Sequence, residues 1–443
     1  MGVDHRLDRV KLAARQVDDI PGVRSPNLTM RLLPTRRLVA GAVLAADVFQ
    51  GGADGTPLLR TGTNLSPDYT KRLLDAGINA VWVEDSVSVG IRATPLIDEG
   101  SRAKATKGIR EAMSSVKDGK QGAQVTDEQI ARLHGVTMRI AEQLQFSSEA
   151  GVALGDLSSA DGYAYRHAVN TTALGLLIGE RLIRQYGYLD WEKKLRYNNI
   201  DIRLLKLGLG LLLHDVGMLS VPESIIYKKG KLTKDEMDVM RQHPDVGARM
   251  FNSWAVSPLV QAVIRRHHER WDGSGYPVGL EGENIHQLGR IAAVVDVYHA
   301  MISNRPHAPA RPPEEAYRTI CDGAGKAFDP LVVQVFRDHV PPFPTGTEVE
   351  LSDGSRALVA GFDAKVGLEK PRLRLIETVG GEDRPGEEFE LKDNPGISIV
   401  RSILIDPPPE RPTGVPREAA AEPADESEPE AEPAPRGADP VAA

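Results

Sequence analysis

Seven histidine and aspartate side chains that could bind metal lie along the middle of this 443-residue chain. Apolar stretches separate them by 24 to 47 residues, and two adjacent pairs occur among them. Imidazole nitrogens and carboxylate oxygens are ligands that divalent iron, manganese or zinc take in proteins. The pattern therefore predicts a metal centre at which distant segments meet. In chain order, the candidate ligands are His167, His214, Asp215, His243, His267, His268 and Asp296.

The adjacent pair His214-Asp215 indicates that the centre holds two ions. One carboxylate between two metals can bridge them, and here it stands beside an imidazole that could bind the first ion. The pair is therefore placed to bind one divalent ion and to reach a second. The choice among Fe, Mn and Zn stays open, because histidine and aspartate suit all three metals.

Helical segments are expected to bring these ligands together. The His214-Asp215 pair ends the apolar helix expected over Arg203–Leu213, which puts both side chains at the rim of a buried layer. Gly208 and Gly210 within that helix are read as sites of close helix packing rather than as a phosphate-binding loop.

The second histidine pair and the last aspartate also follow from helical placement. His267-His268 comes after the apolar run Leu259–Ile264, and consecutive helical residues lie about 100° apart, so both rings can approach one centre. Asp296 lies among apolar residues of Ile291–Met301, where an ionised group needs a cation or another partner.

Composition limits the function classes. The length allows two to four domains, and 41% hydrophobic with 26% charged residues is typical of a globular protein. The net charge is −8, but nine acidic residues against three arginines put −6 of it on residues 407–443. With no basic stripe on the remainder, duplex nucleic acid is a poor candidate partner.

Cysteine content and hydropathy indicate the compartment. Cys321 is the single cysteine, which excludes an intrachain disulfide and fits a reducing environment. Met1–Val17 lacks the apolar stretch of a signal peptide, and no apolar run approaches the roughly 20 residues that span a bilayer. We expect a cytoplasmic protein without membrane insertion.

The expected fold is multidomain, with an all-α core between small β-rich modules. Capping boxes at Thr126/Gln129 and Thr233/Glu236 mark helix starts, and Ser66 is the expected N-cap of a helix over Ser66–Ala76. The expected divisions are a flexible N-terminus (1–28), a β-rich module (29–96), a helical linker (97–155), the metal-binding helical domain (156–340), a small β domain (341–405) and a disordered Pro/Glu/Ala tail (406–443).

Both β modules are predicted from short apolar or alternating runs between turns. In the first module the runs are Leu38–Leu44, Pro57–Leu59 and Ala80–Val83. In the second they are Thr347–Leu351, Arg356–Val359 and Arg372–Ile376, with turns at Asp353-Gly354 and Gly380-Gly381.

From about Asp161 to Val340 the chain resembles the HD-GYP family, a branch of the HD metal-dependent phosphohydrolases. The most specific stretch is His267-His268-Glu269-Arg270-Trp271-Asp272-Gly273-Ser274-Gly275-Tyr276-Pro277, which ends in the triplet that gives the family its name. His214-Asp215-Val216-Gly217, Lys231-Leu232-Thr233 with His243-Pro244, and Asp296 with Arg305 match further family motifs. The flanking β modules look like segments that accompany this domain.

The resemblance implies an HD-type helical core that hydrolyses cyclic di-GMP to pGpG, GMP or both. It implies the seven candidates as metal ligands, Asp215 and His214 as catalytic residues, and two ions bridged by Asp215 and a hydroxide, which would attack near neutral pH. Implied substrate contacts are Gly275, Tyr276, Pro277 and Arg305, the last as a donor to phosphate. A homodimer is a further expectation.

Four positions depart from the family pattern. Met218 stands where lysine is usual, His299 where a second aspartate is usual, and His307 and Ala308 where an aromatic and a basic residue are usual. Three outcomes stay open: a weaker phosphodiesterase, an enzyme for another nucleotide, or an adaptor that binds cyclic dinucleotide or recruits diguanylate cyclase proteins. The intact ligand set favours turnover.

Tyr163 predicts a two-metal rather than a three-metal centre. Some family members carry a glutamate four residues before the first ligand, on the same helix face as the residue equivalent to His167. A neutral phenol is a poor ligand near pH 7, and Asp161-x-Tyr163 resembles the two-metal members.

Overall fold

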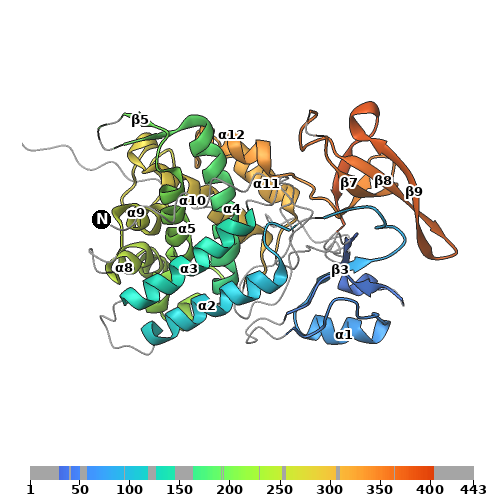
Figure 1. The fold of residues 1–443 in the computed structure, drawn as a ribbon, viewed down its shortest axis with the longest axis horizontal. Coiled ribbons are helices and arrows are strands. Elements are labelled where there is room, and N and C mark those ends of the chain that lie inside the picture. Colours follow the sequence, from blue (N-terminus) through green and yellow to red (C-terminus); the bar gives the residue numbers. More distant parts are fainter. Residues whose placement is uncertain are drawn as a thin grey trace, which may run out of the picture.

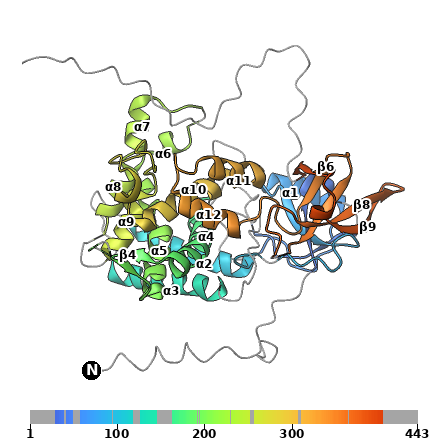
Figure 2. The ribbon, with the colours of Figure 1, turned by 90° about the horizontal axis from the view of Figure 1, so that it is seen from above.

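The computed structural model places a helical domain beside a β-rich part that contains both the first and the last described strands (Figures 1 and 2). It describes residues 29–38, 41–49, 57–93, 95–117, 126–144, 163–190, 192, 194–228, 230–251, 256–305, 310–363 and 365–403. The expectations for the N-terminus and the acidic tail, and for Asp161, His307 and Ala308, lie outside these residues. No helix in the described ranges is long and apolar enough to cross a membrane.

The first β module is a three-stranded antiparallel sheet with one helix. Its strands β1 (Arg31–Pro34), β2 (Val43–Leu44) and β3 (Ala80–Glu84) lie in the order β1-β3-β2. Helix α1 (Pro67–Asp75) begins after Ser66, as predicted, although the serine side chain makes no capping hydrogen bond.

Eleven helices form the described helical part, with the short hairpin of β4 (Tyr188–Leu189) and β5 (Leu195–Arg196) between two of them. Both predicted capping boxes form: Thr126 and Gln129 exchange hydrogen bonds before α3, and Thr233 and Glu236 do so before α7. The helices are α2 (Glu99–Lys117), α3 (Asp127–Leu144), α4 (Tyr163–Tyr186), α5 (Ile200–Leu213), α6 (Glu223–Ile226), α7 (Lys234–Met240), α8 (His243–Arg249), α9 (Pro258–Arg266), α10 (Gln287–Ile302), α11 (Pro313–Asp322) and α12 (Pro330–His339).

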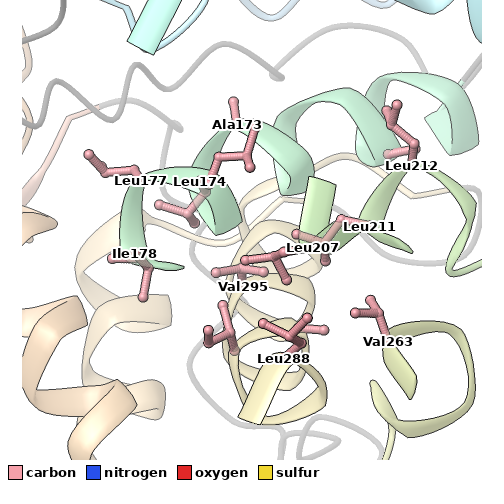
Figure 3. Close-up of a cluster of buried hydrophobic side chains, with 14 of the residues drawn as sticks. Ala173, Leu174, Leu177, Ile178, Leu207, Leu211, Leu212, Val263, Leu288 and Val295 are labelled. Carbon is pink, nitrogen blue, oxygen red and sulfur yellow. The ribbon is translucent and has the colours of Figure 1, made fainter. Parts of the chain in front are cut away.

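The main apolar core lies between α4, α5, α9 and α10, as Figure 3 shows with side chains such as Leu174, Leu211 and Val295. Glycines permit the close approach of α5 to its neighbours. A Cβ on Gly208 would lie 2.5 Å from a methyl of Thr137 in α3, and one on Gly210 would lie 2.5 Å from the Cβ of Val263 in α9. The prediction that these glycines serve helix packing is confirmed.

The C-terminal sheet has five antiparallel strands in the order β10-β6-β7-β8-β9. Its first three strands in the chain are β6 (Glu348–Leu351), β7 (Arg356–Gly361) and β8 (Arg372–Val379). They match the three predicted runs, except that β6 begins one residue later than predicted. The remaining strands, β9 (Glu382–Glu390) and β10 (Ile399–Ser402), complete the sheet.

The two β modules pack against each other although almost the whole helical domain separates them in sequence. The backbone N–H of Leu32 donates to the carbonyl of Gly346 at 2.9 Å. The fully buried carboxylate of Glu348 lies 3.0 Å from a guanidinium nitrogen of Arg37, 2.8 Å from one of Arg356 and 3.5 Å from one of Arg31. We call these four side chains the Glu348 network.

Two contacts attach the β modules to the helical domain near the end of α10. Ala310 belongs to an apolar cluster with Leu32 and Trp82 of the first module. The buried carboxylate of Glu314 in α11 accepts hydrogen bonds from the backbone N–H and the hydroxyl of Ser402 in β10. The β modules therefore contact the segment that follows Arg305, a residue implied in substrate binding.

His286, the N-cap of α10, should make stability depend on pH. Its Nδ1 accepts a hydrogen bond from the Leu288 N–H at 3.2 Å, and burial, with Arg203 and Arg290 nearby, lowers its pKa from 6.5 to about 4. Because the unfolded chain then binds a proton that the folded chain does not, this contribution is complete above pH 6.5 and is lost as the pH falls towards 4. Because the His286 ring is partly exposed, we expect its protonation to lower the free energy of unfolding by about 2 kcal/mol over this pH range.

The matched variant is His286→Asn, since asparagine caps a helix well but does not titrate in this range. Urea unfolding of the metal-free chain between pH 7 and pH 4 should show a smaller loss of stability in the variant than in the wild type. Parallel curves for the two proteins would contradict this assignment.

Candidate metal centre

The candidate ligands stand at the ends of buried helices and inside two others. His214 is the C-cap of α5 and His267 the C-cap of α9, while His243 is the first residue of α8. His167 lies in α4 and Asp296 in α10, both buried. Helix ends place side chains at the edge of the core, where they face one another rather than solvent.

A glycine allows the His214-Asp215 turn to reach α8. After Asp215 the chain continues as the 3-10 helix η4 (Val216–Ser220). A Cβ on Gly217 would lie 2.0 Å from the carbonyl oxygen of His243 and 2.7 Å from the backbone nitrogen of Gly247. Only glycine fits this approach, which brings the turn and His243 together.

The structure gathers the ligand atoms into two groups that share Asp215. One group holds His167, His214 and Asp215, and the other holds Asp215, His243, His267 and His268; within each, the ligand atoms lie within 4.8 Å of one another. Such groups of nitrogen and oxygen donors fit divalent metal ions.

The two oxygens of Asp215 face different groups. Its Oδ2 lies 3.3 Å from Nε2 of His214, whereas its Oδ1 lies 3.4 Å from Nε2 of His243 and 3.7 Å from Nε2 of His267. The Asp215 side chain is 30% exposed, so the centre opens to solvent at this residue.

Asp296 joins the first group. Its Oδ1 lies 2.9 Å from Nε2 of His167 and 3.7 Å from Nε2 of His214. All seven residues predicted from the sequence therefore lie in one continuous cluster.

Backbone carbonyls fix three of the imidazoles. Nδ1 of His214, His243 and His267 lies 2.7, 2.9 and 2.8 Å from the carbonyl oxygen of the residue three positions earlier. Because each Nδ1–H donates to a carbonyl, Nε2 is the nitrogen that points to the shared centre and is left to bind a metal. These hydrogen bonds set the tautomer that a metal ligand needs.

The protonation states suit ligands. Burial opposes ionisation of Asp215, but the nearby charge of His214 holds the pKa of this carboxyl well below the usual range. Asp296 behaves in the same way, because the hydrogen bond from His167 and the nearby charge of His214 outweigh its burial. Burial, together with the neighbouring His267, lowers the pKa of His268 far enough to keep this ring neutral.

His268 provides a direct test of whether a metal fits here. Its Nδ1 is buried and has no hydrogen-bond partner among the described residues. A buried polar atom without a partner is costly in free energy. The cost is removed if this Nδ1 itself binds an ion, so the residues present fit a divalent metal.

The loop with the Gly-Tyr-Pro triplet packs against the second group. The Tyr276 ring stacks on His268 with centroids 4.6 Å apart, and the Tyr276 N–H donates to the His268 carbonyl. A Cβ on Gly275 would lie 2.3 Å from the backbone nitrogen of Arg270 and 2.5 Å from the His268 carbonyl. Gly275 is therefore required by close backbone contact, while Pro277 follows in a cis peptide.

Glu269 anchors this loop, a role that sequence reasoning missed. Its buried carboxylate accepts hydrogen bonds from the backbone N–H groups of Val278, Gly279 and Leu280 at 3.2, 3.0 and 2.9 Å. Arg266 pairs with it at 3.0 Å. Its position directly after the histidine pair was a signal, because an acid among buried residues needs donors.

We expect Glu269→Gln to lower the free energy of unfolding by about 2 kcal/mol, because the amide NH₂ faces donors and leaves buried N–H groups without acceptors. Denaturant unfolding of the metal-free chain measures this change. Glu283→Gln, at an exposed glutamate in the same region, is the control. Equal losses in both variants would show that the carboxylate does not anchor the loop.

The other predicted substrate residue, Arg305, lies just beyond α10. Its guanidinium Nε is buried without a hydrogen-bond partner in the part of the chain that is described. His299 occupies the position where the family usually has an aspartate, and its Nδ1 lies 2.9 Å from Nδ1 of His167. The Tyr163 hydroxyl lies 3.3 Å from the same His167 atom. Both side chains thus approach the Nδ1 edge of the His167 ring, whereas its Nε2 faces Asp296.

Comparison with known proteins identifies the same region. Residues 194–332 match the HD domain family. The chain is 35% identical over 277 residues to the cyclic di-GMP phosphodiesterase PA4108 of Pseudomonas aeruginosa, covering 62% of this chain and 61% of that protein. It is 44% identical over 127 residues to a cyclic di-GMP phosphodiesterase of Thermotoga maritima, covering 28% of this chain and 34% of that protein.

A third relative is named for another nucleotide. The chain is 34% identical over 166 residues to the 3'3'-cGAMP-specific phosphodiesterase 2 of Vibrio cholerae, covering 37% of this chain and 30% of that protein. The chain thus spans about three fifths of the first relative and about a third of the other two. Residues 194–332 are thus an HD domain, and they contain the His-Asp turn and the Gly275-Tyr276-Pro277 triplet, which lies beside the ligand cluster.

Proposed function

We propose that this chain is a metal-dependent phosphodiesterase that hydrolyses cyclic di-GMP to pGpG, GMP or both. One observation carries the proposal: Asp215 directs one oxygen to His214 and the other to His243 and His267, the arrangement expected of a carboxylate that bridges two ions. Two of the relatives described above bear the name of this activity.

In this proposal the seven clustered residues hold two divalent ions. One ion would be held by His167, His214 and Asp296 and the other by His243, His267 and His268, with Asp215 available to both. Ions held there would lower the pKa of a water molecule and offset charge on the phosphoryl oxygens. The exposed side of Asp215 gives a phosphodiester access, while Tyr276 and Arg305 contact the rest of the substrate.

The proposal is tested by incubating chain loaded with Mn²⁺ or Fe²⁺ with cyclic di-GMP and separating the products by chromatography. Formation of pGpG or GMP supports it. Cleavage of 3'3'-cGAMP but not of cyclic di-GMP would favour the second candidate, which the name of the Vibrio cholerae relative suggests. Tight binding of cyclic di-GMP without cleavage would favour an adaptor, for which diguanylate cyclase proteins are the proposed partners; homodimer formation and a cytoplasmic location stay predictions.

We expect about two metal ions per chain. Tyr163 lies one helical turn before His167 and directs a neutral hydroxyl to its Nδ1, so a third ion there would lack a carboxylate from this position. Metal analysis of chain reconstituted with excess Mn²⁺ and then desalted measures the ratio. Tyr163→Phe is the control and should leave it unchanged, whereas a reproducible ratio of three would contradict the prediction.

A further inference from the structure

A cyclic dinucleotide carries two phosphates, and only one can occupy the metal centre at a time. The second phosphate keeps its negative charge a few ångströms away and needs a cation or donors there. The family pattern supplies cations at positions where this chain has Met218 and Ala308. Another basic residue near the Tyr276 loop could therefore bind this second phosphate.

Most arginines that follow or precede the histidine pair are engaged in the fold. Arg266 pairs with the buried carboxylate of Glu269. Arg270 is buried, and its Nη1 donates to the carbonyls of His267 and Glu269. These guanidinium groups hold the loop in place.

Arg241 differs from them. Its Cζ lies 5.5 Å from the centroid of the Tyr276 ring, the same ring that stacks on His268. Its Nε is buried without a hydrogen-bond partner, and among the described residues no carboxylate lies within ion-pair distance of its guanidinium. A half-buried arginine without an acid lacks the partner that offsets its desolvation.

The backbone fixes where this side chain starts. Arg241 is the C-cap of α7, its N–H donates to the carbonyl of Met237 at 2.8 Å, and α8 begins two residues later at His243. The Tyr276 ring therefore lies between the guanidinium and His268, whereas Met218 comes three residues after Asp215 in the chain. The distance between the Arg241 guanidinium and the candidate ligands suits the second phosphate of a dinucleotide whose first phosphate is at the metal centre.

We propose that Arg241 binds the phosphate of the cyclic dinucleotide that is not being cleaved; this inference rests on the function proposed above. The planar guanidinium matches two phosphate oxygens, and its charge completes the pairing that Arg241 lacks in the protein alone. The contact is made equally in the ground state and the transition state, so it affects KM rather than kcat.

The test compares Arg241→Gln and Arg241→Lys with the wild type, all loaded with Mn²⁺. The substrates are cyclic di-GMP and bis(p-nitrophenyl) phosphate, which has a single phosphate. For Arg241→Gln we expect KM for cyclic di-GMP to rise roughly 10- to 100-fold with kcat and metal content unchanged. The KM of Arg241→Lys should lie between those of the wild type and Arg241→Gln, because lysine keeps the positive charge but not the planar, bidentate guanidinium. Cleavage of the small diester should not change.

Arg249→Gln is the matched control, since Arg249 is an exposed arginine in α8. An unchanged KM for cyclic di-GMP in Arg241→Gln would overturn the inference and leave the proposed function intact. Equal loss of activity on both substrates, or loss of metal, would also overturn it, because Arg241 would then act by positioning Tyr276 and His268. A wild type that cleaves only the small diester and binds no cyclic dinucleotide would overturn the proposed function and the inference together.

Discussion

Asp215→Ala should abolish hydrolysis and release metal from both halves of the centre. The carboxylate is the one side chain that belongs to both ligand groups, with separate oxygens directed to each. Its removal takes a negatively charged ligand from each ion. It also leaves buried imidazoles facing one another, with the Nε2 atoms of His243 and His267 3.2 Å apart. Loss of metal assistance worth several kcal/mol corresponds to a fall in kcat of at least about 10³-fold.

Metal content and cyclic di-GMP turnover are the measurements, with circular dichroism to confirm that the variant is folded. Asp215→Asn keeps the shape and should lose turnover even where it retains the fold. Asp238→Ala, at an exposed aspartate in α7, is the control. Full metal content or normal turnover in a folded Asp215→Ala chain would end the two-metal proposal.

Met218→Lys should raise turnover of cyclic di-GMP by about 100-fold, because a cation beside the scissile phosphate stabilises charge that develops in the transition state. Met218 lies in η4, directly after the Asp215 turn, and is half-buried. Methionine offers neither charge nor a strong donor, so we expect the wild type to be slow. The substitution removes none of the seven candidate ligands, so metal content should stay constant.

The rate at saturating cyclic di-GMP, compared with metal content, decides this prediction. Met218→Leu serves as the control for shape without charge and should match the wild type. Unchanged or lower turnover in a folded, fully metallated Met218→Lys chain would instead favour a pocket adapted to another nucleotide. Testing 3'3'-cGAMP in parallel separates these outcomes.

Local sequence signals predicted most of the helical part. Capping boxes and apolar periodicity marked α3, α5 and α7, and an acid in an apolar run drew attention to Asp296. These signals work because capping hydrogen bonds and helical periodicity depend on residues a few positions apart. The meeting of the candidate ligands was predicted from residue type and resemblance, and their distances needed the structure.

The strands were harder to predict. β1 begins with Arg31, whose buried charge is satisfied by Asp85 at 2.7 Å, and β9 contains Pro385 and many charged residues. Neither reads as an apolar or alternating run, since each strand is specified by partners elsewhere in the chain. The role of Gly217 was hidden for the same reason, because it depends on backbone atoms that only the fold brings near.

The Glu348 network also has a consequence for the order of assembly. Arg37 and Glu348 are 311 positions apart in sequence, so a ribosome must release nearly the whole helical domain before they can meet. Until then the apolar residues Leu32 and Trp82 lack their later neighbour Ala310. We therefore expect the helical domain, rich in local contacts, to fold first and to hold the two β modules near each other. Their ion pairs would then form last, when closing so long a loop no longer carries its full entropic cost.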